Sequence, residues 1–395
     1  MIRNIIPMIV AILTAFLTTA CFAQPSAPFK ADPARFAEFD KQMESEIKAG
    51  KIVGCSAMVI QDGKLIYKKL WGKRDRKKDL PVTEDTIWRI YSMSKPITSV
   101  AVMTLVESGK LKLDEPVSTY LPEFKDLQVM KRDGTKVDCE RQMTVRDLLR
   151  HTSGLTYGIF GNTNVDKAYQ NERVLIFDKD VKETVAKLSK LPLLYQPGTR
   201  WHYSVSTDVL GRVVEVASGK TFAEYLEEKI FKPLKMDDTF FTVPTDKLKR
   251  FAEMYRPSGS GLKAANKFSS VRFVNQKNKY YSGGGGLCST MKDYLQFCQM
   301  MVNEGELDGT RILKAETVKE MTKNQLTGKM ASRGFKFGLG FRISPLGHYS
   351  WGGAAGTRFW CDPENKIVGV YMIQINPYRA KRYGDNFCRL LYRKR

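Results

Sequence analysis

Residues 90–97 read Ile90-Tyr91-Ser92-Met93-Ser94-Lys95-Pro96-Ile97 and contain an S-x-x-K tetrapeptide. Beyond it, apolar and small residues recur with the 3.6-residue period of a helix that has one buried face. Pro96 fits such a helix only in the first turn, where its missing backbone N–H is not needed. The pattern predicts that Ser92 lies at or just before a helix N-terminus, with the Lys95 amine within reach of its hydroxyl.

This arrangement suits nucleophilic catalysis. A serine hydroxyl is a weak nucleophile until a neighbouring base takes its proton, and a lysine amine can be that base. A helix N-terminus adds positive potential and N–H groups where an oxyanion would form. The same tetrapeptide also occurs by chance on solvated helix starts, so the rest of the chain has to decide between the two interpretations.

The N-terminus reads as an export signal, residues 1–23. Arg3 is followed by an apolar run at 5–17 that is too short to span a bilayer comfortably, and small residues precede Gln24. We therefore expect a mature chain that begins at Gln24 and is periplasmic or secreted. The alternative is a lipoprotein acylated at Cys21.

The 395-residue chain carries 64 Lys and Arg against 42 Asp and Glu, a formal net charge of +22. Such an excess favours loose attraction to anionic cell-envelope surfaces. The basic residues are scattered and no nucleic-acid-binding motif is present, so we expect no nucleic-acid partner. The length suits one large domain, and the oligomeric state stays open.

Cysteine and histidine usage adds little chemistry. Cys55 and Cys298 lie in apolar runs and are predicted core residues, whereas any disulfide pairing stays open. The histidines show no metal-ligand spacing, so neither a metal nor another cofactor is expected. The cysteines beyond the signal peptide are Cys55, Cys139, Cys288, Cys298, Cys361 and Cys388.

Strand patterns occur near both ends of the chain. Residues 55–60 and 65–71 flank Asp62-Gly63, a strong hairpin signal. Further strands are predicted at 337–343, 357–361 and 367–375.

The middle of the chain reads as helical. Thr144 and Thr221 begin capping boxes, Asp180 or Asp178 can cap the next helix, and Ser206 can cap another. Strands at both ends with helices between them predict an α+β fold. We expect a domain at 24–395 whose antiparallel sheet, flanked by helices, comes from about 30–105 and 280–395, with a mostly helical insertion at about 106–279.

Three further segments accompany the S-x-x-K tetrapeptide. They read Trp201-His202-Tyr203-Ser204-Val205-Ser206, His151-Thr152-Ser153-Gly154-Leu155 and Trp351-Gly352-Gly353-Ala354-Ala355-Gly356. Together they resemble the serine β-lactamase-like superfamily, most closely the class C β-lactamases and the esterases that share their fold. The likeness runs from about Phe36 to the C-terminus.

The resemblance implies a role for each matching residue. Ser92 matches the nucleophile, and Lys95 matches its partner. Tyr203 matches the tyrosine that serves as base toward the serine and then as acid toward the leaving group, with the Lys95 charge close by. The backbone N–H groups of Ser92 and Ala354 match the oxyanion hole, and Gly352 and Gly353 let a substrate backbone come close.

Two positions depart from the β-lactamase pattern. Val205 stands where those enzymes have an asparagine, and Trp351 stands where they have the lysine of K-T-G. Both missing groups help to hold a β-lactam, and the tryptophan looks like the version of the esterase branch. His202 is a candidate pocket residue beside Tyr203, His151 is expected to make a structural hydrogen bond, and the run Gly283–Gly286 is expected to be a flexible loop at the pocket edge.

The sequence thus favours an exported serine hydrolase that forms an acyl-enzyme and acts on small to medium carboxylic esters. Rival activities are those of a class C β-lactamase and of a D-amino-acid peptidase or amidase of the cell wall. A non-catalytic binding protein on the same fold is the remaining alternative.

Overall fold

The computed structural model describes residues 29–175, 179–259, 261–265, 271–332, 334–378 and 383–393. The predicted signal peptide, Cys21 and Asp178 lie outside these ranges. From Ala31 onward the chain forms one compact unit. Within the described ranges, no helix combines the length and apolar character needed to cross a membrane.

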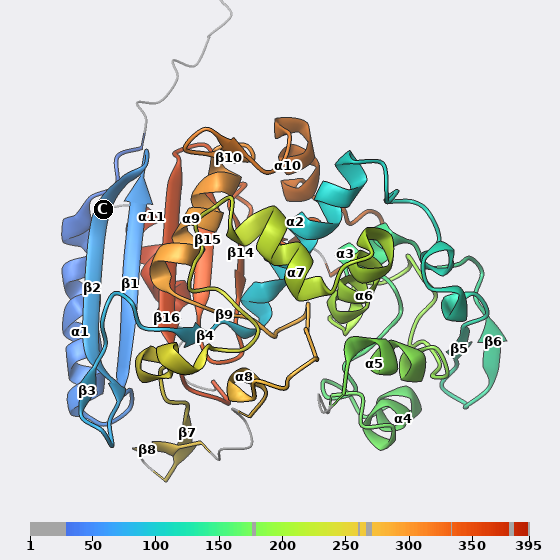
Figure 1. Cartoon of the computed structure of the whole chain (residues 1–395), viewed down its shortest axis with the longest axis horizontal. Helices are drawn as coiled ribbons and strands as arrows, with labels where there is room; N and C mark the ends of the chain where they lie inside the picture. The colour runs from blue at the N-terminus through green and yellow to red at the C-terminus, as the bar shows by residue number, and fades with distance from the viewer. Residues whose placement is uncertain are drawn as a thin grey trace, which may run out of the picture. The chain divides into compact units, whose positions relative to one another are not determined.

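A large antiparallel sheet unites the two ends of the chain, as Figure 1 shows in blue and red. Its strands among the described residues follow the order β12-β13-β14-β15-β16-β1-β2-β3. The N-terminal β1 pairs with the C-terminal β16, with Cys55 opposite Ile373. The α+β prediction is confirmed. The bounds are β1 Gly54–Gln61, β2 Lys64–Asp75, β3 Leu80–Pro81, β12 Lys336–Phe337, β13 Arg342–Ile343, β14 Tyr349–Gly352, β15 Arg358–Asp362 and β16 Ile367–Ile373.

Helices cover both faces of this sheet. Phe359 and Trp360 are neighbours on β15, so their side chains point to opposite faces. Phe359 meets Tyr294 of α9 (Met291–Val302), with ring centres 5.2 Å apart. Trp360 meets Phe387 of α11 (Tyr383–Tyr392) at 5.4 Å, and α1 (Ala37–Lys48) packs beside α11 through Phe39. The described core cysteines Cys55 and Cys298 are fully buried as predicted, and all six described cysteines are free thiols.

The region between the two sheet-forming parts, called here the helical region, has more of its described residues in helices than in strands. The Thr144 and Thr221 capping boxes are confirmed, and Asp180 caps its helix. The prediction for Ser206 is wrong, because the helix already begins at Ser206 and Val205 precedes it without a capping side chain. The helices are α3 Val145–Leu149, α4 Asn164–Asn171, α5 Val181–Leu188, α6 Ser206–Ser218, α7 Phe222–Leu226 and α8 Val271–Val274, with hairpins β5 Gln128–Met130 to β6 Lys136–Asp138 and β7 Tyr255–Ser258 to β8 Gly261–Ala264.

The conformation of turn residues explains why one strand prediction is confirmed and another is wrong. Asp62 and Gly63 take φ values of 50° and 72° and close the β1–β2 hairpin as predicted. The single strand predicted at 337–343 is wrong, because the chain turns there and forms β12 and β13. Gly340 has a φ of 94°, which an extended strand cannot contain.

Helix α2 (Ser94–Glu107) lies between the sheet and the helical region, as Figure 1 shows. Every residue from Ser94 to Met103 is buried, so the expectation of one buried face is wrong. The helix packs against α6 and α7 on the helical side, which leaves little of its surface to water. The first turn of α2 is therefore surrounded by packed side chains and backbone.

Candidate active site

Ser92 lies in the short helix η2 (Tyr91–Met93), directly before α2, as the sequence predicts. The preceding Tyr91 has a φ of 44°, a left-handed conformation that is rare for a bulky residue. Ser94 holds this turn, since its Oγ donates to the Tyr91 carbonyl (2.6 Å) and accepts the Leu287 N–H (3.1 Å). These bonds fix the half-buried Ser92 at the start of α2.

Lys95 is almost completely buried, with 1% of its surface exposed. Its Nζ donates to the Tyr157 hydroxyl at 2.9 Å and to the Gly284 carbonyl at 2.6 Å. The same Nζ lies 4.6 Å from the ring centre of Tyr203. The structure therefore brings together Lys95 and Tyr203 from distant parts of the chain, beside the turn that carries Ser92.

Tyr157 is a member of this group that sequence reasoning missed. Burial raises the pKa of its hydroxyl well above the usual value, and the neighbouring Tyr203 and Asp208 raise it further, in part through a hydrogen bond with Tyr203. Tyr157 is thus a neutral phenol whose oxygen accepts a hydrogen bond from Lys95 and whose O–H can donate one to Tyr203. Its only signal in the sequence was its place two residues after Leu155.

The run Gly283–Gly286 is not the flexible pocket-edge loop that we expected. Gly283, Gly284 and Gly286 are buried. A Cβ on Gly284 would come within 2.4 Å of Asp208 Oδ2 and 3.0 Å of the Tyr157 hydroxyl. Asp208, a second residue that the sequence did not reveal, accepts from Ser282 Oγ (2.5 Å) and the Gly284 N–H (3.2 Å). Glycine is required here because the backbone must approach Lys95 closely.

The segment that follows strand β14 lies against Ile90, just before the turn that carries Ser92. A Cβ on Gly353 would come within 2.4 Å of the Ile90 carbonyl oxygen and 2.2 Å of Thr357 Oγ1. The Gly353 N–H donates to the Thr357 carbonyl at 2.9 Å, and the exposed Ala354 follows in the turn to β15. Within the described ranges, no acceptor takes the Ala354 N–H. Gly352 ends β14 opposite Arg358.

Aromatic side chains surround Tyr203. The ring centres of His151, Trp351 and Phe160 lie 4.9, 5.4 and 5.9 Å from it, and Trp201 stacks at 6.3 Å. These rings displace water and lower the local dielectric, which strengthens the field of the Lys95 charge.

Val205, His202 and His151 are the remaining residues that the sequence singled out. Val205 is buried in the hydrophobic core with 1% exposure. The His202 Nε2 pairs with Thr156 Oγ1 at 3.2 Å, and the pKa of this ring is lowered, chiefly by burial, although Asp166 opposes the shift. His151 makes the expected structural contact, to Ser204 Oγ at 3.4 Å, and burial lowers its pKa well below the usual value. It is therefore neutral at pH 7.

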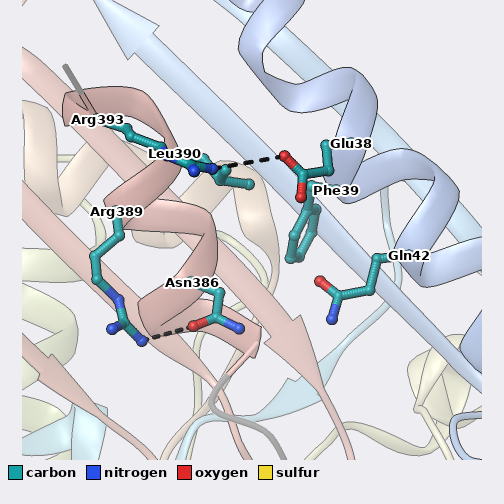
Figure 2. A pocket seen from close by; sticks show the side chains of 7 residues that line it. All are labelled: Glu38, Phe39, Gln42, Asn386, Arg389, Leu390 and Arg393. Carbon is teal, nitrogen blue, oxygen red and sulfur yellow. Dashed lines mark hydrogen bonds and ion pairs between the residues drawn. The ribbon is translucent and has the colours of Figure 1, made fainter. Parts of the chain in front are cut away.

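A separate hollow of about 710 Å³ lies between α1 and α11. Figure 2 shows Glu38 and Arg393 paired across it, with N–O atoms 3.9 Å apart, and Arg389 bonded to Asn386. None of the residues that line it belongs to the Ser92 group.

The sheet and helical region have the arrangement of β-lactamases and transpeptidases. The structure of EstCE1, described as a hydrolase with promiscuous acyltransferase activity, superposes with a TM-score of 0.78 over 91% of this chain and 99% of its own, at 24% identity. The Beta-lactamase family model matches residues 37–391, and the chain belongs to that family.

Two relatives match most of the chain. Protein Rv1367c of Mycobacterium tuberculosis is 34% identical over 83% of this chain and 87% of its own length. Esterase EstB of Burkholderia gladioli is 31% identical over 87% and 91%. The chain is a serine hydrolase of the β-lactamase fold.

Proposed function

We propose that this protein is an exported carboxylesterase that forms an acyl-enzyme on Ser92 and acts on esters with small to medium acyl groups. The observation that carries the proposal is the buried Lys95, which lies one helical turn from Ser92 and has its Nζ 4.6 Å from the Tyr203 ring centre. A cation held beside this ring stabilises negative charge that develops in the site during the reaction. It therefore supports a serine site with tyrosine as the proton carrier.

The reaction follows from these positions. Tyr203 takes the proton of the Ser92 hydroxyl as Oγ attacks the ester carbon, and the backbone N–H groups of Ser92 and Ala354 stabilise the oxyanion. Tyr203 then gives the proton to the alcohol oxygen, which leaves as the C–O bond breaks. A water molecule reverses these steps, releases the carboxylic acid and restores Ser92. Tyr157 holds Lys95 and Tyr203 in place throughout.

Trp351 supports an ester substrate rather than a β-lactam. It lies 5.4 Å from Tyr203 and 5.4 Å from Phe337, ring centre to ring centre, so it forms an apolar wall. Such a wall suits a neutral acyl group and provides no cation for a β-lactam carboxylate. The likeness to esterase EstB points the same way. A β-lactamase and a cell-wall D-amino-acid peptidase are the rivals.

Export rests on the sequence of residues 1–23. We propose a periplasmic or secreted protein that begins at Gln24, with its net charge of +22 giving loose attraction to the cell envelope. N-terminal mass analysis of the protein from its native host tests this proposal. An acylated Cys21 would establish the lipoprotein instead.

Intact-mass measurement tests the catalytic proposal. The protein is incubated with p-nitrophenyl acetate, p-nitrophenyl butyrate, a cephalosporin and a D-alanyl-D-alanine peptide, and we expect acyl adducts on Ser92 with the esters. Ser92→Ala should remove the adducts and lower kcat by thousands-fold or more. Faster turnover of the cephalosporin or the peptide than of the esters would overturn the esterase. No covalent adduct with any of them would favour a binding protein.

A further inference from the structure

We propose that the alcohol half of the ester substrate is a flat, bulky, neutral apolar group that lies on the Ile159–Phe160 side of the site. This inference rests on the proposed function and names its substrate class. Ile159 and Phe160 are 58% and 61% exposed, unusual values for large apolar side chains that lie together beside a buried charge.

Phe160, which follows Ile159 in the chain, contacts the site directly. The Phe160 ring lies 5.9 Å from the Tyr203 ring and 5.8 Å from the Tyr157 ring. Trp201 also stacks on Tyr203, at 6.3 Å, and meets the half-buried Phe335 at 4.6 Å. We call this surface the aromatic rim, made of Ile159, Phe160, Trp201 and Phe335. It leads from Tyr203 to solvent.

The position of Tyr203 decides which half of the ester meets the rim. A group that gives its proton to the leaving oxygen must lie within hydrogen-bond distance of that oxygen. The alcohol substituent therefore starts beside Tyr203, where the exposed Phe160 lies at 5.9 Å and the partly exposed Trp201 at 6.3 Å. The acyl carbon stays at Ser92 and the Ala354 N–H.

Charge decides against a cationic alcohol, which aromatic rings could otherwise hold. The Lys95 ammonium lies 4.6 Å from the Tyr203 ring centre, and the Arg342 guanidinium lies 5.9 Å from that of Phe335. The Trp201 indole N–H is buried and has no acceptor among the described residues. Cations and N–H donors repel a positive group, whereas flat apolar rings attract a neutral one.

Acetate esters of different alcohols isolate this surface, because all of them give the same acetyl-enzyme. We compare kcat/KM for phenyl acetate, 2-naphthyl acetate and the acetate of 3-(trimethylammonio)phenol, using the complete mature chain. The 2-naphthyl ester should exceed the phenyl ester by about tenfold, as expected for extra apolar contact in a pocket. Phe160→Ala and Ile159→Ser should each lower that ratio to about threefold or less. Leu65→Ala removes an apolar side chain of similar exposure (51%) on the distant β2 and should leave the ratio unchanged.

The outcomes separate the two proposals. The proposed substrate class is wrong if the phenyl and naphthyl esters react at equal rates, or if the ratio is unchanged in both rim variants. Acetylation of Ser92 in the same experiment would still support the esterase proposal. The fastest reaction with the cationic ester would overturn it in favour of an ammonium site. Loss of binding to phosphatidylglycerol vesicles in the rim variants, with the ratio unchanged, would assign the rim to a membrane surface. No acetylation by any ester would contradict the proposed function itself.

Discussion

Replacing Tyr157 by phenylalanine tests the arrangement around Lys95 most directly. The change deletes one hydroxyl and keeps the ring that packs against Phe160 and Tyr203. Lys95, a residue that is only 1% exposed, then loses one of its two described acceptors, at 2.9 Å. A hydrogen bond to a charged group is worth about 1.5–3 kcal/mol. If that bond orders the site, kcat/KM should fall by about 10- to 150-fold.

The assay is steady-state hydrolysis of p-nitrophenyl acetate by Tyr157→Phe beside two reference variants. Tyr203→Phe removes the proposed proton carrier and should lose about a thousandfold or more. Tyr225→Phe makes the same chemical change at a buried hydroxyl that pairs with Thr104 (2.8 Å) outside the site. It should leave kcat/KM unchanged. Thermal unfolding of all three variants separates loss of stability from loss of rate.

Two results would refute this reasoning. Activity of Tyr157→Phe within twofold of the wild type would mean that the Lys95 contact has no role in ordering the site. A loss as large as that of Ser92→Ala, with Tyr203→Phe still active, would make Tyr157 the proton carrier and reverse the roles of the two tyrosines.

Three further predictions concern single residues. Gly353→Ala should lower kcat by about tenfold or more, because its Cβ would meet the Ile90 carbonyl oxygen at 2.4 Å. Gly261→Ala serves as the control, since its Cβ meets nothing closer than 3.9 Å. Equal activity of the two variants would contradict the packing argument. Trp351→Lys should shift relative kcat/KM toward anionic β-lactams by about tenfold, measured as a cephalosporin-to-ester ratio; a ratio that does not rise would show that this wall does not select the substrate. Burial by itself raises the pKa of the fully buried Asp147, but hydrogen bonds from Arg141 and other donors outweigh burial, so the pKa is lowered in the folded protein. The ionised Asp147 therefore stabilises the folded protein above the unfolded pKa of about 4. This stabilisation is lost as the pH falls through the lower pKa of the folded state. The melting temperature should therefore drop steeply below about pH 4, and the drop should be shallower in Asp147→Asn. If the melting temperature of the variant falls with pH as steeply as that of the wild type, the Asp147 carboxylate is not the cause of the drop.

The sequence by itself determined the parts of this protein that depend on local chemistry. Asp62-Gly63 fixed a hairpin because both residues tolerate positive φ. Capping boxes fixed the starts of α3 and α7. The S-x-x-K spacing placed Ser92 and Lys95 one helical turn apart, since that distance depends only on helix geometry.

The sequence alone did not predict the features that depend on contacts between distant segments. Helix α2 is buried on every side because the sheet and the helical region enclose it, which the periodicity of its own sequence cannot show. Gly283, Gly284 and Gly286 are buried, and the Gly284 N–H donates to Asp208 of the distant helix α6. A run of glycines occurs both in flexible loops and in tightly packed ones, so the sequence alone does not distinguish the two.

Tyr157 is the clearest case. No spacing rule relates it to Lys95, 62 positions away in the chain, and a tyrosine in a turn is ordinarily a surface residue. Only the tertiary structure buries its hydroxyl between a cation and a second tyrosine. The raised pKa of the Tyr157 hydroxyl is a consequence of burial and of the neighbouring groups, which the fold alone supplies.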